Sequence, residues 1–273
     1  MNKPATDRFR LTPRDREVLV EVFLSNCLTS RQAVGLGLFT GRSRANRRLK
    51  ALADRGYLRR KPLPVGQSSS ETAYFIGLNA VAVVAAHTGT DAEEVRRHAC
   101  RPMGRTFIEH SVLVTTCRIR LMALAAGREV EWRSEAECRH EYSASGSDGI
   151  RRPHVLKADG AIVFGGEAPF VAFFEGDRNF VSPLHWERTV RGYSRYARLG
   201  LCLEAYGTAS FAVLVVTEGG EGRVRRLSSI ARQSPVPFHF ATVTSLMADP
   251  DFWLGQAGGT RLSLQQIIGE GEE

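Results

Sequence analysis

The spacing of apolar residues at the start of the chain predicts three short helices followed by a two-stranded hairpin. Apolar side chains recur every three to four residues, as on one face of a helix, in residues 11–26, 29–39 and 42–55. Two short runs follow at residues 57–61 and 72–76, separated by a segment rich in Pro, Gly and Ser that suits a turn. Three helices and a hairpin in this order predict a winged helix-turn-helix.

The third of these helices has two chemically different faces. Ala45, Leu49 and Leu52 fall on one side at helical spacing, whereas basic and polar residues occupy the others. Such a helix suits the DNA major groove, where Arg pairs with guanine and Asn with adenine, and further cations neutralise phosphates. An alternative is a protein-interaction domain with a solvated charged face. The predicted contacts with double-stranded DNA are Ser43, Arg44, Asn46, Arg47 and Lys50 on the helix, and Arg59, Arg60 and Lys61 of the hairpin against the DNA backbone.

The charge is distributed unevenly, which favours the DNA-binding interpretation. Residues 1–65 hold 15 Lys and Arg against 5 Asp and Glu, a net charge of +10, whereas the remainder hold 22 against 24. A basic module joined to a nearly neutral domain is typical of proteins that bind nucleic acid. Binding should then weaken steeply as the salt concentration rises.

The pattern changes after a polar segment at residues 91–104, which we expect to be a linker. Helical and strand periods then alternate, and an unbroken apolar run at residues 210–217 predicts a strand buried on both faces. This alternation predicts an α/β (α+β) domain with a mixed central sheet. The other elements expected are helices at 106–126, 184–198 and 221–232, strands at 129–134 and 237–244, a mobile loop up to residue 153, and a hairpin within 157–177.

The hairpin within residues 157–177 carries three carboxylates. Asp159 precedes its first apolar run, and Glu175 and Asp177 close the second, two residues apart and therefore on the same face. Antiparallel pairing would bring Asp159 close to Glu175. Carboxylates gathered at a strand end suit Mg²⁺, which prefers oxygen ligands. The alternative is that these are solvated acids at the strand ends.

Cysteines and hydropathy exclude several other classes of protein. The five cysteines are scattered without a C-x-x-C pair, so neither a disulfide framework nor a zinc site is indicated. No apolar run is long enough for a membrane span, and the N-terminus is polar, without a signal-peptide core. We expect a cytoplasmic protein with no membrane partner.

Several motifs together resemble the replication-relaxation family of bacterial mobile elements and actinobacterial chromosomes. They are His-Thr-Gly at 87–89, a long helix containing His110, Glu-Gly-Asp at 175–177 before a helix bearing tyrosines, and ATVTSLMADPDFW at 241–253. The resemblance covers most of residues 11–254. It implies a winged helix-turn-helix fused to a PD-(D/E)XK restriction-endonuclease-like domain. The expected domains are residues 1–90, a linker at 91–104, a nuclease-like domain at 105–255 and a flexible acidic tail at 256–273.

The resemblance also assigns roles to the hairpin acids. The first acid of the nuclease pattern falls on Asp159 and the second on Glu175, and both would hold Mg²⁺ together with Asp177 in an active enzyme. However, Asp177 stands where the pattern has its lysine. A cation on the next helix, Arg188 or Arg191, could replace that lysine, although arginine cannot serve as a base.

Two functional hypotheses follow. The first is a DNA-binding regulator of transcription, or of plasmid replication or transfer. It would act as a homodimer, need no cofactor and carry a degenerate nuclease-like domain. The second is a Mg²⁺-dependent DNA endonuclease or nickase that acts in plasmid relaxation or defence.

Overall fold

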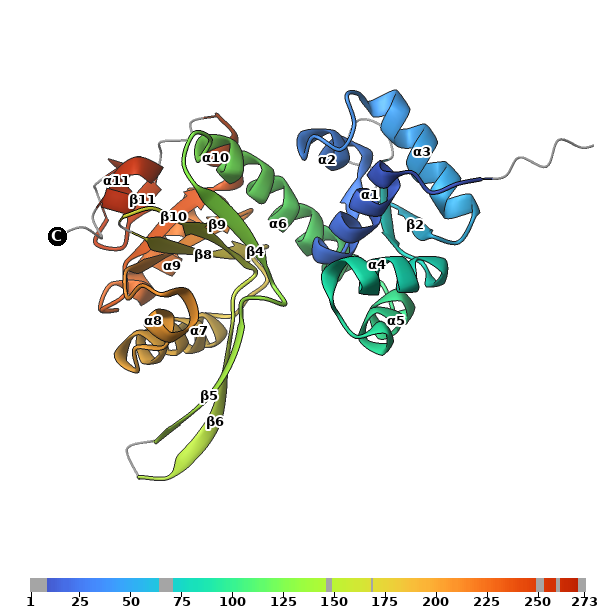
Figure 1. The fold of residues 1–273 in the computed structure, drawn as a ribbon. Coiled ribbons are helices and arrows are strands. Elements are labelled where there is room, and N and C mark those ends of the chain that lie inside the picture. The colour runs from blue at the N-terminus through green and yellow to red at the C-terminus, as the bar shows by residue number, and fades with distance from the viewer. Residues whose placement is uncertain are drawn as a thin grey trace, which may run out of the picture. The chain divides into compact units, whose positions relative to one another are not determined.

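The computed structural model describes residues 9–63, 71–145, 149–167, 169–248, 253–258 and 261–269 of the chain. The chain divides into two compact units, with the boundary between Val112 and Leu113. Each unit contains both helices and strands (Figure 1), which confirms the predicted mixed α/β class. Among the helices of the described residues, none combines the length and apolar character that a bilayer span requires.

Three helices open the first unit where the sequence predicted them. They are α1 (Pro13–Leu24), α2 (Ser30–Gly35) and α3 (Arg42–Asp54). A capping box starts α1: Thr12 Oγ1 accepts a hydrogen bond from the Asp15 N–H at 3.2 Å, and an Asp15 carboxylate oxygen accepts one from the Thr12 N–H at 2.6 Å. These reciprocal bonds cap the first turn of α1, where backbone N–H groups have no carbonyl four residues earlier within the helix. The buried core of the unit includes Val18, Leu19, Val22, Ala45, Leu49 and Leu52.

A three-stranded antiparallel sheet completes this helical group. Its order is β1 (Leu28–Thr29), β3 (Thr72–Ile76) and β2 (Leu58–Pro62), and β2 pairs with β3 along its whole length. The tip of this predicted hairpin, residues 64–70, lies outside the described residues. The order of helices and hairpin is compatible with the predicted winged helix-turn-helix.

The segment predicted as a linker, residues 91–104, contains a packed helix instead. Helix α5 spans Ala92–Cys100, and the Asp91 side chain caps its first turn. Val95 and Ala99 are buried in the core of the first unit. The helix was missed because only these two residues, four apart, mark its apolar face in a polar sequence. It follows η1 (Leu78–Ala80) and α4 (Val81–Thr88).

Helix α6 (Arg105–Leu124) crosses the boundary between the units, and a mixed sheet forms the centre of the second. The sheet order among the described residues is β12-β11-β10-β9-β8-β7-β4. Strands β8, β9 and β10 run parallel, and β7 and β8 form the predicted antiparallel hairpin. The strands are β4 (Val130–Ser134), β7 (Gly160–Phe164), β8 (Phe170–Asp177), β9 (Phe211–Thr217), β10 (Phe238–Thr242), β11 (Trp253–Gly255) and β12 (Arg261–Leu262).

Helices cover both faces of this sheet (Figure 1). Alternate residues of β9 belong to different cores: Val213 and Val215 to one, Leu214 and Val216 to the other. Burial on both faces explains why β9 reads as an unbroken apolar run. The first core is covered by α7 (Pro183–Arg198), α8 (Leu201–Tyr206) and α9 (Gly220–Ala231), and the second by α6, α10 (Val243–Ala248) and α11 (Leu264–Gly269).

The prediction of a mobile loop before residue 153 is wrong over most of that segment. Strands β5 (Arg139–Ser145) and β6 (Arg151–Lys157) pair antiparallel as a separate hairpin (Figure 1). Most of their residues are exposed, with Ala144 and Leu156 as the buried ones. The strands lack a strong apolar alternation because so few of their residues face a core.

The predicted flexible tail also differs from the structure in its described part. Helix α11 buries Leu264, Ile267 and Ile268 in one of the two cores of the second unit. Residues 259–260 and 270–273 of that tail lie outside the described residues.

Candidate nucleic-acid interface

Helix α3 has the two faces that its sequence predicts. Ala45 and Leu49 are fully buried, whereas Ser43, Arg47 and Lys50 are exposed. The apolar stripe therefore fixes the helix to the unit, and the basic and polar side chains remain accessible.

A groove of about 400 Å³ lies between α3 and the β2–β3 hairpin. Arg42, Asn46 and Lys50 line it from the helix at intervals of four residues, and Arg60 lines it from β2. Glu71 is its acidic lining residue. Arg42 is not among the contacts predicted from the sequence, although its spacing from Asn46 and Lys50 places all three on one side of the helix.

The three basic residues predicted to contact the DNA backbone from the hairpin differ in their surroundings. Arg59 donates to the backbone oxygens of Ile76 and Arg101, at 3.3 and 3.2 Å, and Lys61 donates to that of Met103 at 2.8 Å. Arg60 is half-exposed and lies 3.6 Å from a carboxylate oxygen of Asp54. Arg60 is thus the hairpin cation that faces the groove, whereas Arg59 and Lys61 hold the segment that leads into α6.

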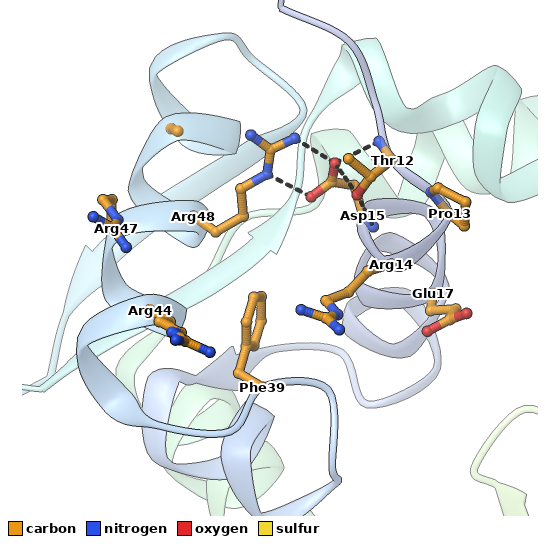
Figure 2. Close-up of a pocket in the computed structure, with 10 residues that line it drawn as sticks. Thr12, Pro13, Arg14, Asp15, Glu17, Phe39, Arg44, Arg47 and Arg48 are labelled. Carbon is orange, nitrogen blue, oxygen red and sulfur yellow. Dashed lines mark hydrogen bonds and ion pairs between the residues drawn. The ribbon is translucent and has the colours of Figure 1, made fainter.

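A second and larger pocket, of about 710 Å³, lies on the other side of α3, against α1. We call it the α1–α3 pocket. Arg14 reaches into it from α1 and Arg44 from α3, with the ring of Phe39 between them (Figure 2). Arg44 donates to the Thr40 hydroxyl at 3.1 Å. Arg47 lies at the edge of the pocket.

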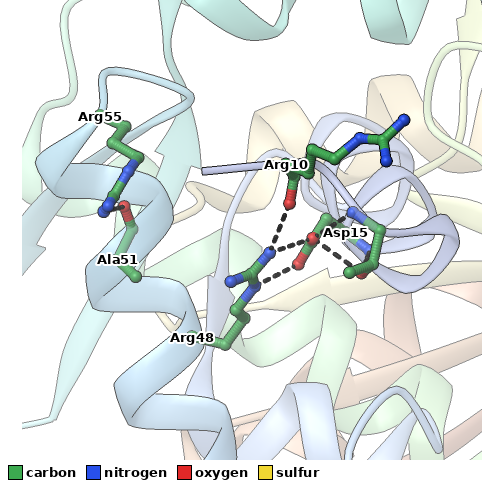
Figure 3. A network of polar contacts seen from close by, with 6 residues as sticks. Arg10, Asp15, Arg48, Ala51 and Arg55 are labelled. Atoms are coloured by element: carbon green, nitrogen blue, oxygen red, sulfur yellow. Dashed lines mark hydrogen bonds and ion pairs between the residues drawn. The ribbon is translucent and has the colours of Figure 1, made fainter. Parts of the chain in front are cut away.

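An ion pair between α1 and α3 closes one end of the α1–α3 pocket. Arg48 binds both carboxylate oxygens of Asp15 and also donates to the Arg10 carbonyl at 3.2 Å (Figure 3). Burial opposes ionisation of Asp15, but its hydrogen bonds with Arg48 and Thr12 outweigh this and lower its pKa below the usual value. The guanidinium of Arg48 is therefore neutralised, unlike those of Arg14 and Arg44.

In the second unit, Asp159 and Glu175 lie close together at one end of the β7–β8 hairpin. Asp159 accepts a hydrogen bond from the Gly176 N–H at 2.8 Å, and Glu175 accepts one from the Tyr193 hydroxyl at 2.6 Å. Burial, followed by the like charge of Asp159, raises the pKa of Glu175 well above its usual value, although Tyr193 and Lys157 act in the opposite direction. The predicted proximity of these two acids is therefore present.

Asp177 has a different environment from Glu175, although both lie on the same face of β8. Its carboxylate accepts two hydrogen bonds from Arg223 and one from the Thr217 hydroxyl, at 2.7 Å. Over the residues that the structure describes, no three His, Cys, Asp or Glu side chains are grouped so that they could hold a metal ion. The three hairpin acids are therefore not gathered into one ligand set.

The cations and hydroxyls around the acid pair differ from those expected. Arg188 is exposed on α7, and Arg191 lies 3.8 Å from Glu187 on the same helix. Tyr193 is the α7 residue that contacts Glu175. Lys157, two residues before Asp159, forms an ion pair with Glu135.

The fold and these sites define a two-unit α/β protein whose first unit exposes a basic helix. The chain belongs to the replication-relaxation family, because the family model of that description matches residues 24–211. The match includes α3, the β2–β3 hairpin and the Asp159–Glu175 pair. No curated protein and no solved structure matches the chain.

Proposed function

We propose that this protein binds duplex DNA in a sequence-specific manner through a winged helix-turn-helix formed by its first unit. The observation that carries the proposal is the surface of α3: Ser43, Asn46, Arg47 and Lys50 are exposed beside a groove lined by Arg42 and Arg60.

The residue types on this surface match what base recognition requires. Arg and Asn can each make paired hydrogen bonds to the edges of guanine and adenine in the major groove. The remaining cations neutralise phosphates, which fix the position of the helix but carry no sequence information. Arg47 and Asn46 are the proposed base readers, and Arg42, Lys50 and Arg60 the proposed phosphate contacts nearest to them.

Family membership supports a role for this binding in the replication or transfer of a plasmid or another mobile element. In this proposal the protein is a regulator that acts in the cytoplasm as a homodimer on a two-fold DNA site, the usual way in which such modules gain affinity. The second unit would supply the dimer contact or further DNA contacts.

The test is a double substitution, Arg47→Ala with Lys50→Ala. Removing a side chain that reads a base should weaken specific binding by roughly 1–3 kcal/mol, while the fold stays intact because both side chains are exposed. The matched control is Arg96→Ala with Arg97→Ala on α5, which removes the same charge from the same unit. Equal affinities of the two double variants for the selected site would contradict the proposal.

A second candidate function, a Mg²⁺-dependent endonuclease or nickase, is favoured by the Asp159–Glu175 pair. Two carboxylates are sufficient for Mg²⁺, which keeps several waters and also binds substrate phosphates. The ion would activate water and offset charge on the leaving oxygen. The positive charge of Lys157 lowers the pKa of Glu175. In this candidate function Lys157 would take the place of the lysine of the nuclease pattern, where this chain has Asp177. Asp177 itself is held by Arg223.

Nicking of supercoiled plasmid tests this second candidate. It predicts strand breaks with Mg²⁺ or Mn²⁺ that disappear in EDTA and in Asp159→Asn, whereas Glu131→Gln on the exposed side of β4 retains them. Plasmid that stays supercoiled with both ions would exclude the candidate and leave the DNA-binding function intact.

A further inference from the structure

Helix α3 has cations on both of its flanks as well as on its outer face. On the hairpin side, Arg42 and Lys50 line the groove shared with β2 and β3. On the opposite side, Arg44 lines the α1–α3 pocket together with Arg14 (Figure 2). Arg14 has no role among the contacts predicted from the sequence, and Arg44 is among them only as a residue of α3.

Two cations of the α1–α3 pocket, Arg14 and Arg44, lack an acidic partner among the described residues. Within the described residues, Arg14 makes no hydrogen bond or ion pair, and Arg44 is bonded to the neutral hydroxyl of Thr40. Asp15 is neutralised by Arg48, and Glu17 points away from Arg14 (Figure 2). Two guanidinium groups that face one pocket repel each other, so an anion bound in that pocket would be stabilised by both.

The position of the pocket indicates which anion it would hold. An α-helix with its side chains is about 10–12 Å wide, close to the width of about 12 Å of the DNA major groove. The two flanks of a helix in that groove therefore face the phosphates of opposite strands. If the hairpin side of α3 meets one strand, the α1 side meets the other.

We propose that the α1–α3 pocket binds a phosphate group of the DNA backbone, with Arg14 and Arg44 as its cationic ligands. The proposal rests on the proposed function and extends it: the protein contacts both strands across the major groove, the hairpin on one side and α1 on the other. Arg14 is then a positioning residue. It sets the register of α3 on the duplex without reading a base.

The salt dependence of DNA affinity tests this proposal. Each phosphate contact adds about 0.9 to the slope of log affinity against log salt, so Arg14→Ala should lower the slope by about that amount. Between about 50 and 200 mM salt, the affinity ratio of wild type to Arg14→Ala should then fall by about 3.5-fold. Arg44→Ala should behave in the same way. The decrease in affinity should be equal for specific and unrelated duplexes.

Two further variants separate charge from packing. Arg16→Ala removes an exposed arginine from the same helix, outside the pocket, and should keep the wild-type slope. Arg14→Lys retains the charge and should keep most of the slope as well, because an ammonium also neutralises a phosphate.

The failure of this inference can be distinguished from the failure of the proposed function. If Arg14→Ala and Arg16→Ala have the same salt slope while Arg47→Ala loses specific binding, the pocket holds no DNA phosphate and the proposed function stands. If the wild-type protein has no salt-dependent affinity for duplex DNA, both proposals are wrong.

Discussion

Arg223 and Asp177 form a bidentate ion pair in the interior of the second unit. Arg223 Nε and Nη2 donate to the two carboxylate oxygens of Asp177 at 2.8 and 2.9 Å, and Nη2 also donates to the Val181 carbonyl at 2.8 Å. Both side chains are 5% exposed. The pair joins the end of β8 to α9, so Asp177 has a structural role that spacing alone did not indicate.

Removal of Arg223 should therefore destabilise the protein strongly. Arg223→Ala leaves a buried carboxylate without its partner, and we expect the free energy of unfolding to fall by about 3–5 kcal/mol. Urea denaturation measures this change. Arg226→Ala, on the exposed side of the same helix, is the control and should alter stability by no more than about 0.5 kcal/mol. Equal stabilities of the two variants would show that the ion pair contributes nothing net.

Elements whose apolar residues form a clear pattern could be predicted from the sequence. Elements with few apolar residues could not. Strand β9 reads as an apolar run because all seven of its residues are buried. In contrast, α5 and β5 escaped prediction because each directs only one or two apolar residues towards a core. Periodicity measures burial, so it detects little in elements that are mostly exposed.

The candidate sites were predictable only where they depend on a single element. The exposed face of α3 follows from its helical period. The α1–α3 pocket does not, because it joins Arg14 to a helix about thirty residues further along the chain. Similarly, the common face of Glu175 and Asp177 was correct, but the partner of Asp177 lies 46 residues away. Contacts between distant elements have no signature in the local sequence.

The ion pair of Asp15 with Arg48 should make stability depend on pH in the acidic range. The pKa of Asp15 in the folded protein lies below its ordinary value of 3.8. Its contribution to stability is fully present above that value and is lost as pH falls through the folded pKa. The free energy of unfolding of the wild type should thus exceed that of Asp15→Asn by a constant amount above about pH 5, and this difference should shrink below about pH 4.

Urea unfolding of both proteins across this pH range measures the effect. Glu17→Gln removes a neighbouring exposed carboxylate and is the control. The free energy of unfolding of this control should stay close to that of the wild type across the range. A constant gap between wild type and Asp15→Asn down to about pH 2.5 would mean that Asp15 titrates equally in the folded and unfolded chains.

The Asp159–Glu175 pair should make stability decrease as pH rises, which is opposite to the effect of Asp15. The pKa of Glu175 is raised above its ordinary value of 4.5, so stability is lost as pH rises from that value towards the folded pKa. Glu175→Gln should therefore be more stable than wild type at neutral pH, and the gain should grow with pH across this window. Asp159→Asn should lower the pKa of Glu175, because it removes the like charge beside it.

Carboxyl NMR shifts of Glu175 in wild type and in Asp159→Asn measure this coupling directly. Burial of Glu175 remains in the variant, so its pKa should stay above the ordinary value. Glu131→Gln, an exposed acid on β4, should leave the titration of Glu175 unchanged. The same pKa in wild type and Asp159→Asn would mean that the two carboxylates do not interact.

Gly77 links the end of β3 to the turn that follows α3, and it leaves no room for a side chain. A Cβ at this position would lie 2.3 Å from the carbonyl oxygen of Gly56. Since the obstacle is backbone, it cannot rotate away, and Gly77→Ala must push the hairpin from the end of α3. The expected cost is about 1–3 kcal/mol of stability.

The same substitution should also weaken the proposed DNA binding, because the groove between α3 and the hairpin depends on how closely the two elements approach. Gly104→Ala is the matched control in the first unit, since nothing lies within 4 Å of its added methyl group. The melting temperature and the DNA affinity should both fall for Gly77→Ala, and both should stay near the wild-type values for Gly104→Ala. If Gly77→Ala lost stability but kept the full DNA affinity of the wild type well below its melting temperature, the groove would have no part in the proposed DNA binding.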